Sequence, residues 1–406
     1  MKSVASLRTL GVWGTGTLVM LADTDVGNVV AAAQAGTSWG YRLLPLLFVL
    51  VPLLYFVQEL TVRLGIFSGR GYGELVRERF GISWSYVSAI ALVIATIGSL
   101  ITQFTGIAGI GELYGISRTR SLFLATTALI AIAGTGSYRR MQNAALFIGA
   151  FELVFFALAW AAHPDPVAIW RHALDIPWRN GSFMYLAAAL AGAVFSPWMV
   201  FYQQSAVVEK GMSRIDYGAE RLETAVGAVL TQSITAAVLV TMAALATDGS
   251  RTASLRSVSQ IADAMSHLLG GALGRVIFSV GALGGAMVAA IVSSLALAWG
   301  VGEVAGFRRS LECRPMKAPW FYALYVAAVM GCALLVGYVP DLIALNLIAQ
   351  VLNALLSPLV TGLLIALADV ALPAEYRPQG WYRLAIVAGA FGLGAMGLVG
   401  TLGMLL

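Results

Sequence analysis

The feature that most constrains this chain is a series of eleven long apolar runs. They lie near residues 8–38, 43–66, 84–114, 121–137, 142–162, 183–209, 224–247, 270–304, 319–338, 342–368 and 382–405. A helix of about 20 apolar residues spans the hydrocarbon core of a bilayer. Only 11% of the 406 residues are charged, against about 25% in soluble domains. We therefore predict an all-α membrane protein of eleven transmembrane helices, forming one polytopic domain over residues 1–406.

The positions of the basic residues predict the orientation of these helices. Most of the 25 Lys and Arg residues fall on the cytoplasmic side if the N-terminus is placed inside, as the positive-inside rule requires. Arg118 and Arg120 are exceptions. We expect a multi-pass protein of the cell membrane with a cytoplasmic N-terminus and, after eleven helices, an external C-terminus. The basic residues form short clusters between apolar runs, so no nucleic-acid partner is expected. The partners are the lipid bilayer and a small substrate, and no cofactor is expected.

Two apolar runs, the first and the sixth, are interrupted by polar or helix-breaking residues. They lie five segments apart, which divides the chain into repeat one (about 8–162), repeat two (about 183–368) and an extra helix (about 382–405). An odd number of helices in each repeat inverts the second repeat relative to the first. Paired interrupted segments of this kind are typical of a transporter binding site near the middle of the membrane.

The first interruption, residues 23–28, has the sequence Asp-Thr-Asp-Val-Gly-Asn. An ionised Asp at the bilayer centre costs roughly 2.5–3.5 kcal/mol on insertion scales, and Asp23 and Asp25 have no Lys or Arg between residues 9 and 41. A mobile cation is the simplest partner. Gly27 allows the helix to unwind, and Asn28 adds a neutral oxygen and could cap the second half-helix. The alternative is that both Asp residues only cap the outer end of a short helix.

The second interruption covers residues 193–197. Pro197 lacks a backbone N–H and disfavours a continuous helix, which leaves carbonyl groups near Ala193 without helical partners. Ser196 could offer its hydroxyl to a cation. The alternatives are that Ser196 is a small packing residue bonded to its own helix, and that Pro197 only kinks the helix.

At these positions the sequence resembles the Nramp divalent-metal transporters. Residues 25–28 resemble the family's Asp-Pro-Gly-Asn segment, residues 193–198 its Ala-x-x-Met-Pro-His motif, and residues 349–351 with the following Pro358 its Ser-Gln-Val region. The resemblance spans most of the chain. It implies the inverted-repeat LeuT-type fold (5+5, with helices 1 and 6 broken) and transport of a divalent metal. It also implies a metal site formed by Asp25, Asn28, Ala193, Ser196 and Gln350.

Departures from the family pattern suggest which ion is transported. Ser196 replaces a Met whose thioether favours transition metals, so the donors become oxygens, which suit Mg²⁺. Trp198 replaces a His. Gln103 and Gly106 stand at the acidic positions of the family's proton route. Together these changes resemble the Nramp-related magnesium transporters, a branch that runs without proton coupling. Asp23 adds a carboxylate that could hold the outer waters of a hydrated ion.

Three functional hypotheses follow. The first is an alternating-access transporter for Mg²⁺ that also accepts Mn²⁺ and is not proton-coupled. The second is a proton-coupled Mn²⁺ or Fe²⁺ importer of the Nramp type. The third is a sodium-coupled solute carrier of the same fold, with Asp25 in a sodium site. An enzyme is not expected, because the sequence has no His-Glu-x-x-His motif or Ser-His-Asp arrangement. The oligomeric state stays open.

Several other polar residues within the apolar segments have two interpretations. Glu59, Glu112 and Glu152 are expected to pair with basic residues near helix ends, the alternative being a wet permeation path. Glu303 is expected in a solvated cluster with nearby arginines. Asn353, one turn after Gln350, is expected to be structural.

Overall fold

The structure is a computed structural model that describes residues 14–247, 258–266, 268, 270–313, 315–338 and 342–405. Within these ranges it is built of helices and turns, and no described residue lies in a strand. The predicted cytoplasmic N-terminus lies outside the described residues. The helices in chain order are α2 (Thr15–Asp23), α3 (Val26–Trp39), η1 (Gly40–Leu43), α4 (Leu44–Ser68), α5 (Tyr72–Phe80), α6 (Ile82–Leu113), α7 (Arg118–Ala133), α8 (Tyr138–Gly149), η2 (Ala150–Leu153), α9 (Val154–Ala161), α10 (Pro166–Leu174), α11 (Gly181–Val194), α12 (Pro197–Glu209), α13 (Tyr217–Thr247), α14 (Val258–Ser266), α15 (Ala272–Ala305), η4 (Pro315–Lys317), α16 (Pro319–Tyr338), α17 (Leu342–Ala371), η5 (Ala374–Tyr376) and α18 (Gly380–Leu405).

Each of the eleven predicted apolar runs corresponds to one helix or to one interrupted helix, so the predicted helical membrane architecture is confirmed. The first run is the pair α2 and α3, the fifth is α8 with η2 and α9, and the sixth is the pair α11 and α12. By length and composition alone, nine segments among the described residues could cross a membrane. Nine is smaller than the predicted eleven for two reasons. Residues 26–68, which hold α3 and α4, count as one segment, and α7 has 16 residues, fewer than a full span needs.

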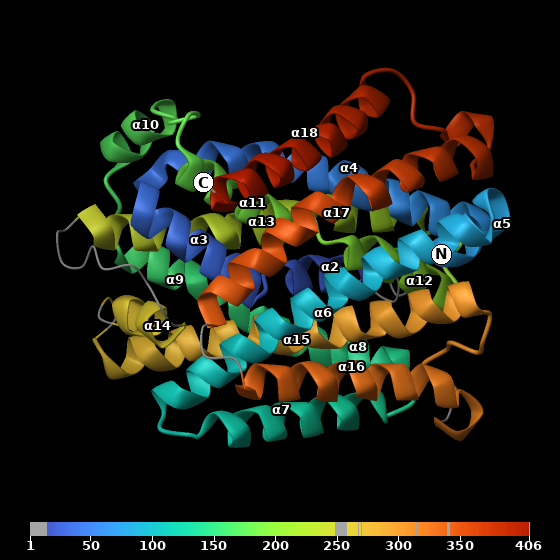
Figure 1. The fold of residues 1–406 in the computed structure, drawn as a ribbon, viewed down its shortest axis with the longest axis horizontal. Coiled ribbons are helices and arrows are strands. Elements are labelled where there is room, and N and C mark those ends of the chain that lie inside the picture. The colour runs from blue at the N-terminus through green and yellow to red at the C-terminus, as the bar shows by residue number, and fades with distance from the viewer. Residues whose placement is uncertain are drawn as a thin grey trace, which may run out of the picture.

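The two interrupted helices lie at the centre of the molecule (Figure 1). The first half-helix, α2, packs against α13, α15 and α8, and α3 packs against α13 and α11. In the sixth segment, α11 packs against α18 and α17, and α12 packs against α15 and α4. The long helices run along the horizontal axis of the view. The short helices α10 and α14 lie at one end of this bundle, and α5 lies at the other.

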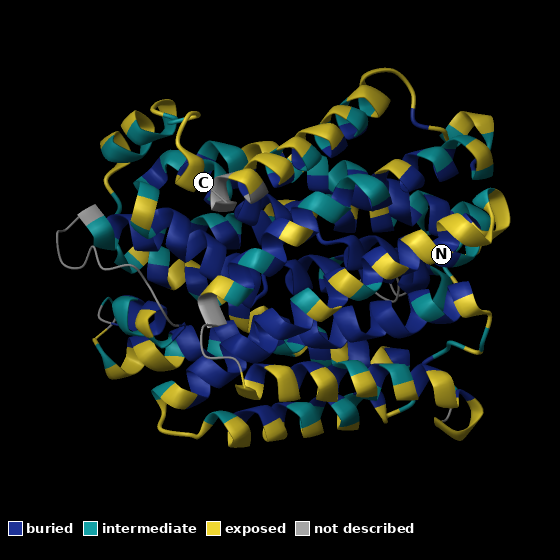
Figure 2. Ribbon diagram, viewed as in Figure 1, coloured by how far each residue is buried: buried dark blue, intermediate teal, exposed yellow. Residues whose placement is uncertain are grey.

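Buried residues concentrate in these central helices, whereas exposed residues concentrate in the peripheral helices (Figure 2). Phe123 on α7, Trp160 on α9 and Phe391 on α18 are examples of large exposed apolar residues. An outer surface of this kind is unfavourable in water and suits lipid. The polar residues of both interruptions are therefore held away from the lipid-facing surface.

Candidate functional site

The first interruption is a local unwinding of two residues between α2 and α3. Asp23 ends α2, and Asp25 is the N-cap of α3, where its Oδ1 accepts a hydrogen bond of 2.8 Å from the Asn28 backbone N–H. The Asn28 side-chain amide donates to the Asp23 carbonyl oxygen. The expectation that Asn28 caps the second half-helix is therefore wrong, because Asp25 occupies the cap position and Asn28 instead ties the two half-helices together.

The other carboxylate oxygen of Asp25 is bound by α6. Gln103 Nε2 lies 2.6 Å from Asp25 Oδ2, and Gln103 Oε1 accepts a hydrogen bond of 3.2 Å from the Val26 backbone N–H. One amide side chain thus satisfies both a buried acceptor and a free helix N-terminal donor. Gln103 and Gly106 stand at the two positions where the family pattern has acidic residues. Of these two, Gln103 contacts Asp25 directly.

At the second of these positions, Gly106, the space for a side chain is occupied by Val26. A methyl group built on Gly106 would lie 2.3 Å from Val26 Cγ2, so Val26 occupies the space that a side chain at position 106 would need. Gly106 stands where the family pattern has an acid and Val26 where it has a Pro, so these two departures are physically linked.

The carboxylate of Asp23 contacts α13. Its Oδ2 accepts from the Thr231 hydroxyl and from Gln232 Nε2, each at 3.3 Å. Asp23 Oδ1 and Asn28 Oδ1 are buried and have no hydrogen-bond partner among the described residues. Buried polar atoms are nearly always satisfied, so orphaned oxygens at one interruption indicate a place for an absent donor or cation.

The second interruption leaves Phe195 and Ser196 between α11 and α12, with Pro197 as the first residue of α12. Ser196 Oγ accepts a 3.1 Å hydrogen bond from Asn353 Nδ2 on α17, so the interpretation that it bonds its own helix is wrong. Pro197 lies at the start of a new helix, where its missing N–H is not needed, and does not kink a continuous one. Ala193 is buried in the last turn of α11.

Gln350 links the two interruptions. Its Oε1 accepts a hydrogen bond of 3.2 Å from Asn353 Nδ2. The same Asn353 nitrogen also donates to Ser196 Oγ. On the other side, a methyl group built on Gly27 would lie 1.8 Å from Gln350 Nε2. The glycine at position 27 thus permits this close approach, since a larger residue would make the Gln350 side chain move. Asn353, expected to be only structural, lies in this network between Gln350 and Ser196.

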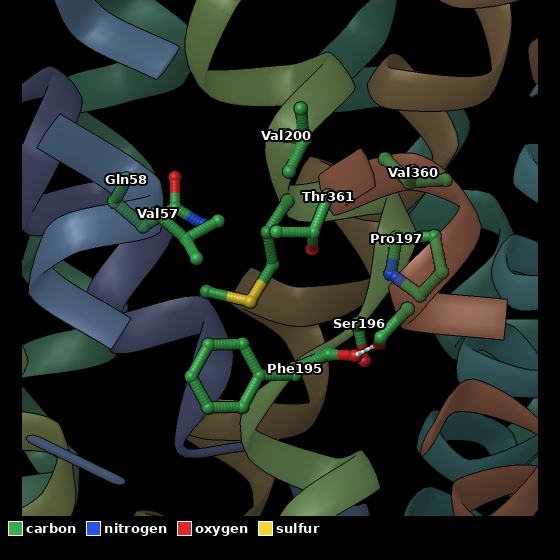
Figure 3. Close-up of a pocket in the computed structure, with 10 residues that line it drawn as sticks. Val57, Gln58, Phe195, Ser196, Pro197, Val200, Val360 and Thr361 are labelled. Carbon is green, nitrogen blue, oxygen red and sulfur yellow. Dashed lines mark hydrogen bonds between the residues drawn. The ribbon is translucent and has the colours of Figure 1, made fainter. Parts of the chain in front are cut away.

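Both interruptions are closed to solvent in this conformation. Asp25 is 5% exposed and Ser196 is 7% exposed. A cavity of about 10 Å³, about the size that one water needs, lies beside Ser196 and is also lined by Met199 and Gln58 (Figure 3). Trp198 is buried, and its Nε1 has no hydrogen-bond partner within the described ranges. In the described part of the chain, no three His, Cys, Asp or Glu residues are grouped closely enough to hold a metal ion.

Two of the four other acidic residues have the expected partners. Glu59 pairs with Arg63 at 2.5 Å, and Glu112 pairs with Arg118 at 2.9 Å.

Glu303 has one of the expected arginine partners, since Arg309 Nε lies 3.7 Å from its Oε1, but the expectation that it is solvated is wrong. Glu303 is only 4% exposed, and the Gly73 N–H and the Ser205 hydroxyl donate to its carboxylate inside the bundle. The expectation that Glu152 pairs with a basic residue is also wrong. Glu152 is fully buried, and neither of its carboxylate oxygens has a hydrogen-bond partner among the described residues.

The fold and the paired interruptions define a class: multi-pass membrane proteins with the LeuT-type fold. The sequence model of the family described as "Natural resistance-associated macrophage protein-like" (Nramp) matches residues 16–402. The chain belongs to this family.

Named relatives agree with this assignment. The divalent metal cation transporter MntH of Yersinia pestis (strain Pestoides F) is 29% identical over 247 residues, which are 58% of this chain and 59% of the relative. The chain thus matches less than two thirds of that relative's length. MntH 1 of Pseudomonas aeruginosa is 30% identical over 324 residues, covering 75% of this chain and 71% of the relative. A solved structure of the Eremococcus coleocola manganese transporter superposes with a TM-score of 0.76 at 16% identity, covering 96% of this chain and 86% of that one.

Proposed function

We propose that this protein transports divalent metal cations, with Mg²⁺ as its substrate and Mn²⁺ also accepted, by alternating access and without obligatory proton movement. The observation that carries the proposal is the set of oxygen atoms at the first interruption. Asn28 Oδ1 and Asp23 Oδ1 are buried and have no hydrogen-bond partner in the described part of the chain, and Asp25 lies between these two residues in sequence. Membership of the Nramp family favours a metal substrate over the sodium-coupled solute carrier.

The proposed site takes oxygen ligands from both interruptions. Asp25, Asn28, the Ala193 carbonyl group, Ser196 and Gln350 would surround the ion, and Asp23 would hold its outer waters. A site with one or two carboxylates and retained waters suits Mg²⁺, which dehydrates reluctantly.

Binding requires a rearrangement in the closed conformation. Both oxygens of Asp25 are engaged, and the Gln103 amide nitrogen lies where a cation would contact Oδ2. The ion would replace this neutral donor, so ion binding would release Gln103. Because an amide cannot accept or deliver a proton, this exchange supports transport without proton movement.

An open pocket at one end of the bundle is the proposed entrance. It has a volume of about 460 Å³ and lies between the ends of α3, α11 and α17, with Trp39, Tyr185 and Leu347 among its lining residues. We propose that this end is external and that the protein lies in the cell membrane, with a cytoplasmic N-terminus and an external C-terminus.

One observation favours the second candidate, a proton-coupled Mn²⁺ importer. Met199 lines the small cavity beside Ser196 (Figure 3), so a soft thioether lies one helical turn from the position at which the family's Met is replaced. The relatives named above include a manganese transporter. Transport of Mn²⁺ with a stoichiometric proton flux would favour this candidate.

The proposal is tested by uptake into proteoliposomes that contain a divalent-cation indicator or a pH indicator. We expect Mg²⁺ and Mn²⁺ uptake without matching acidification, and loss of uptake in Asp25→Ala. Glu112→Gln is the matched control, because Glu112 is an acid in a partly exposed ion pair. Unchanged uptake by a well-folded Asp25→Ala variant would rule out the proposed site, and acidification that matches the metal flux would rule out uncoupled transport.

A further inference from the structure

The small cavity beside Ser196 has the size and the polarity of a position for one water molecule. Its volume is about 10 Å³, which is the room that a single water needs. Four of the residues that line it are polar: Gln58, Ser196, Ser357 and Thr361. A buried water typically has about three polar partners. These four side chains can supply them.

Gln58 brings an unsatisfied acceptor to this cavity. It lies on α4, its side chain is buried, and its Oε1 has no hydrogen-bond partner among the described residues. Two of the hydroxyl groups are already engaged: Ser196 Oγ accepts from Asn353, and Ser357 Oγ donates to the Asn353 carbonyl oxygen at 2.8 Å. Buried polar atoms are nearly always satisfied. An acceptor beside a water-sized cavity therefore indicates a donor of that size, and water is the simplest one.

The cavity lies on the side of the second interruption that is opposite the proposed entrance. The entrance pocket is lined by Leu347 of α17, whereas the cavity is lined by Ser357 and Thr361 of the same helix. Leu347 and Ser357 are ten residues apart, which is about 15 Å along a helix. Figure 3 shows that α4, α17 and the start of α12 meet around the cavity. An ion held by Ser196 would have this cavity directly beside it.

We propose that this cavity holds one of the waters that a bound Mg²⁺ keeps, and that Gln58 and Thr361 fix that water in place. The inference rests on the proposed function, because it needs an ion bound beside Ser196. A water bound to a cation turns its oxygen toward the ion and can donate both of its hydrogens. The unpartnered Gln58 Oε1 and the Thr361 hydroxyl are acceptors for those two hydrogens.

This arrangement makes Gln58 a positioning residue that favours one metal over the other. Mg²⁺ dehydrates reluctantly and usually keeps several waters when a protein binds it. Groups that hydrogen-bond to the ligands of a metal orient those ligands and strengthen binding. A site that fixes a water therefore stabilises Mg²⁺ more than Mn²⁺, which binds more readily through direct protein ligands.

The experiment is isothermal titration of Mg²⁺ and, separately, Mn²⁺ into the purified full-length protein and its variants. Gln58→Leu removes the amide and keeps a side chain of similar bulk. We expect its dissociation constant for Mg²⁺ to rise by about tenfold, the lower end of what loss of an outer partner costs a metal site. Its dissociation constant for Mn²⁺ should rise much less. Equal losses for the two metals, or no loss for Mg²⁺, would overturn the proposal.

Thr361→Val tests the other partner of the same water. It removes the hydroxyl group, keeps the shape of the side chain, and should also weaken Mg²⁺ selectively. Because one water is shared, the double variant Gln58→Leu/Thr361→Val should bind Mg²⁺ about as weakly as the more affected single variant. Additive losses would show that the two residues act independently and would overturn the shared position. If Gln58→Leu does not fold, the metal selectivity of Thr361→Val decides.

Gln204→Leu is the matched control. Gln204 is also a buried glutamine whose Oε1 has no partner in the described part of the chain. It lies eight residues after Ser196, and its Nε2 donates to the Arg70 carbonyl oxygen, outside the cavity. Its substitution should leave the ratio of the two dissociation constants unchanged. A selective loss of Mg²⁺ as large as that in Gln58→Leu would contradict the proposal.

The outcomes also separate this proposal from the proposed function. If the wild-type protein binds no Mg²⁺, the assignment of Mg²⁺ as substrate fails and the water position fails with it. If the wild-type protein binds Mg²⁺ and Asp25→Ala does not, the proposed site stands. Equal losses of Mg²⁺ and Mn²⁺ affinity in Gln58→Leu would then refute the water position alone.

Discussion

Gln103 Nε2 lies 2.6 Å from Asp25 Oδ2 and fixes the carboxylate of the first interruption against α6. The same amide accepts from the Val26 N–H, so it holds both sides of the start of α3. A neutral amide therefore makes the contact at the position where the Nramp pattern has an acid. This contact provides a direct way to alter the charge of the site.

Gln103→Glu should make metal uptake pH-dependent. Two adjacent buried carboxylates cannot easily both be ionised, so the pair would hold a proton that the metal must displace. Uptake should therefore decrease as pH is lowered, and metal binding should release a proton. The measurement is uptake in proteoliposomes across pH with an internal pH indicator. Gln103→Met, which is similar in size and neutral, is the control and should show no such dependence. Equal pH profiles for the two variants would contradict the assigned contact.

Gly106→Ala should destabilise the protein because its new methyl group would clash with Val26 Cγ2. Overpacking of this kind typically costs about 1–3 kcal/mol. Adding Val26→Ala should recover most of the loss, since it empties the same space, and thermal unfolding in detergent measures both effects. Gly98→Ala, also on α6, would place its methyl group 3.3 Å from Ala349 Cβ as the nearest contact and should have a smaller effect. Additive effects of Gly106→Ala and Val26→Ala would show that the two positions are independent.

Arg63→Met should be strongly destabilising. Arg63 is the charged partner of Glu59, whose side chain is buried and also accepts from Tyr217 and Tyr382. Removing one member of a buried pair typically costs about 3–5 kcal/mol, because the other charge remains uncompensated. The double variant Glu59→Gln/Arg63→Met should recover much of that stability in thermal unfolding.

An exposed ion pair supplies the control for this comparison. Arg383 pairs with Asp369 at 2.9 Å near the start of α18, where both side chains are partly exposed. Arg383→Met should cost at most about 1 kcal/mol. A cost for Arg63→Met no larger than that for Arg383→Met would indicate that Glu59 does not depend on its basic partner.

Met199→Leu separates the two candidate functions. If Ser196 is the residue of α12 that contacts the ion, removing the thioether at Met199 should leave the ratio of Mg²⁺ to Mn²⁺ uptake unchanged, since Leu has a similar volume. A marked fall in Mn²⁺ uptake relative to Mg²⁺ would show that the sulfur is a ligand and would favour the manganese importer.

The helical membrane architecture could be predicted because it depends on the length of apolar runs, which the sequence displays directly. The interruptions could also be found, since Asp25, Gly27 and Pro197 are unfavourable within a membrane helix. Membership of the family agrees with the resemblance seen in the motifs.

Contacts between distant segments could not be predicted from composition or spacing. The expectation that Glu152 pairs with a basic residue near a helix end failed, because its side chain lies fully buried inside the bundle. Likewise, the network from Gln350 through Asn353 to Ser196 depends on how α17 packs against α11 and α12. The contact between Val26 and Gly106 likewise depends on the packing of α3 against α6, which the sequence does not display.

The central claim is an oxygen-ligand site that binds Mg²⁺, and competition between Mg²⁺ and Mn²⁺ in isothermal titration of the purified protein tests it most directly. We predict that Mg²⁺ binds the wild-type protein and displaces Mn²⁺, and that Ser196→Met shifts the preference toward Mn²⁺. A wild-type site that binds Mn²⁺ but is not affected by excess Mg²⁺, with the same preference in Ser196→Met, would contradict the account.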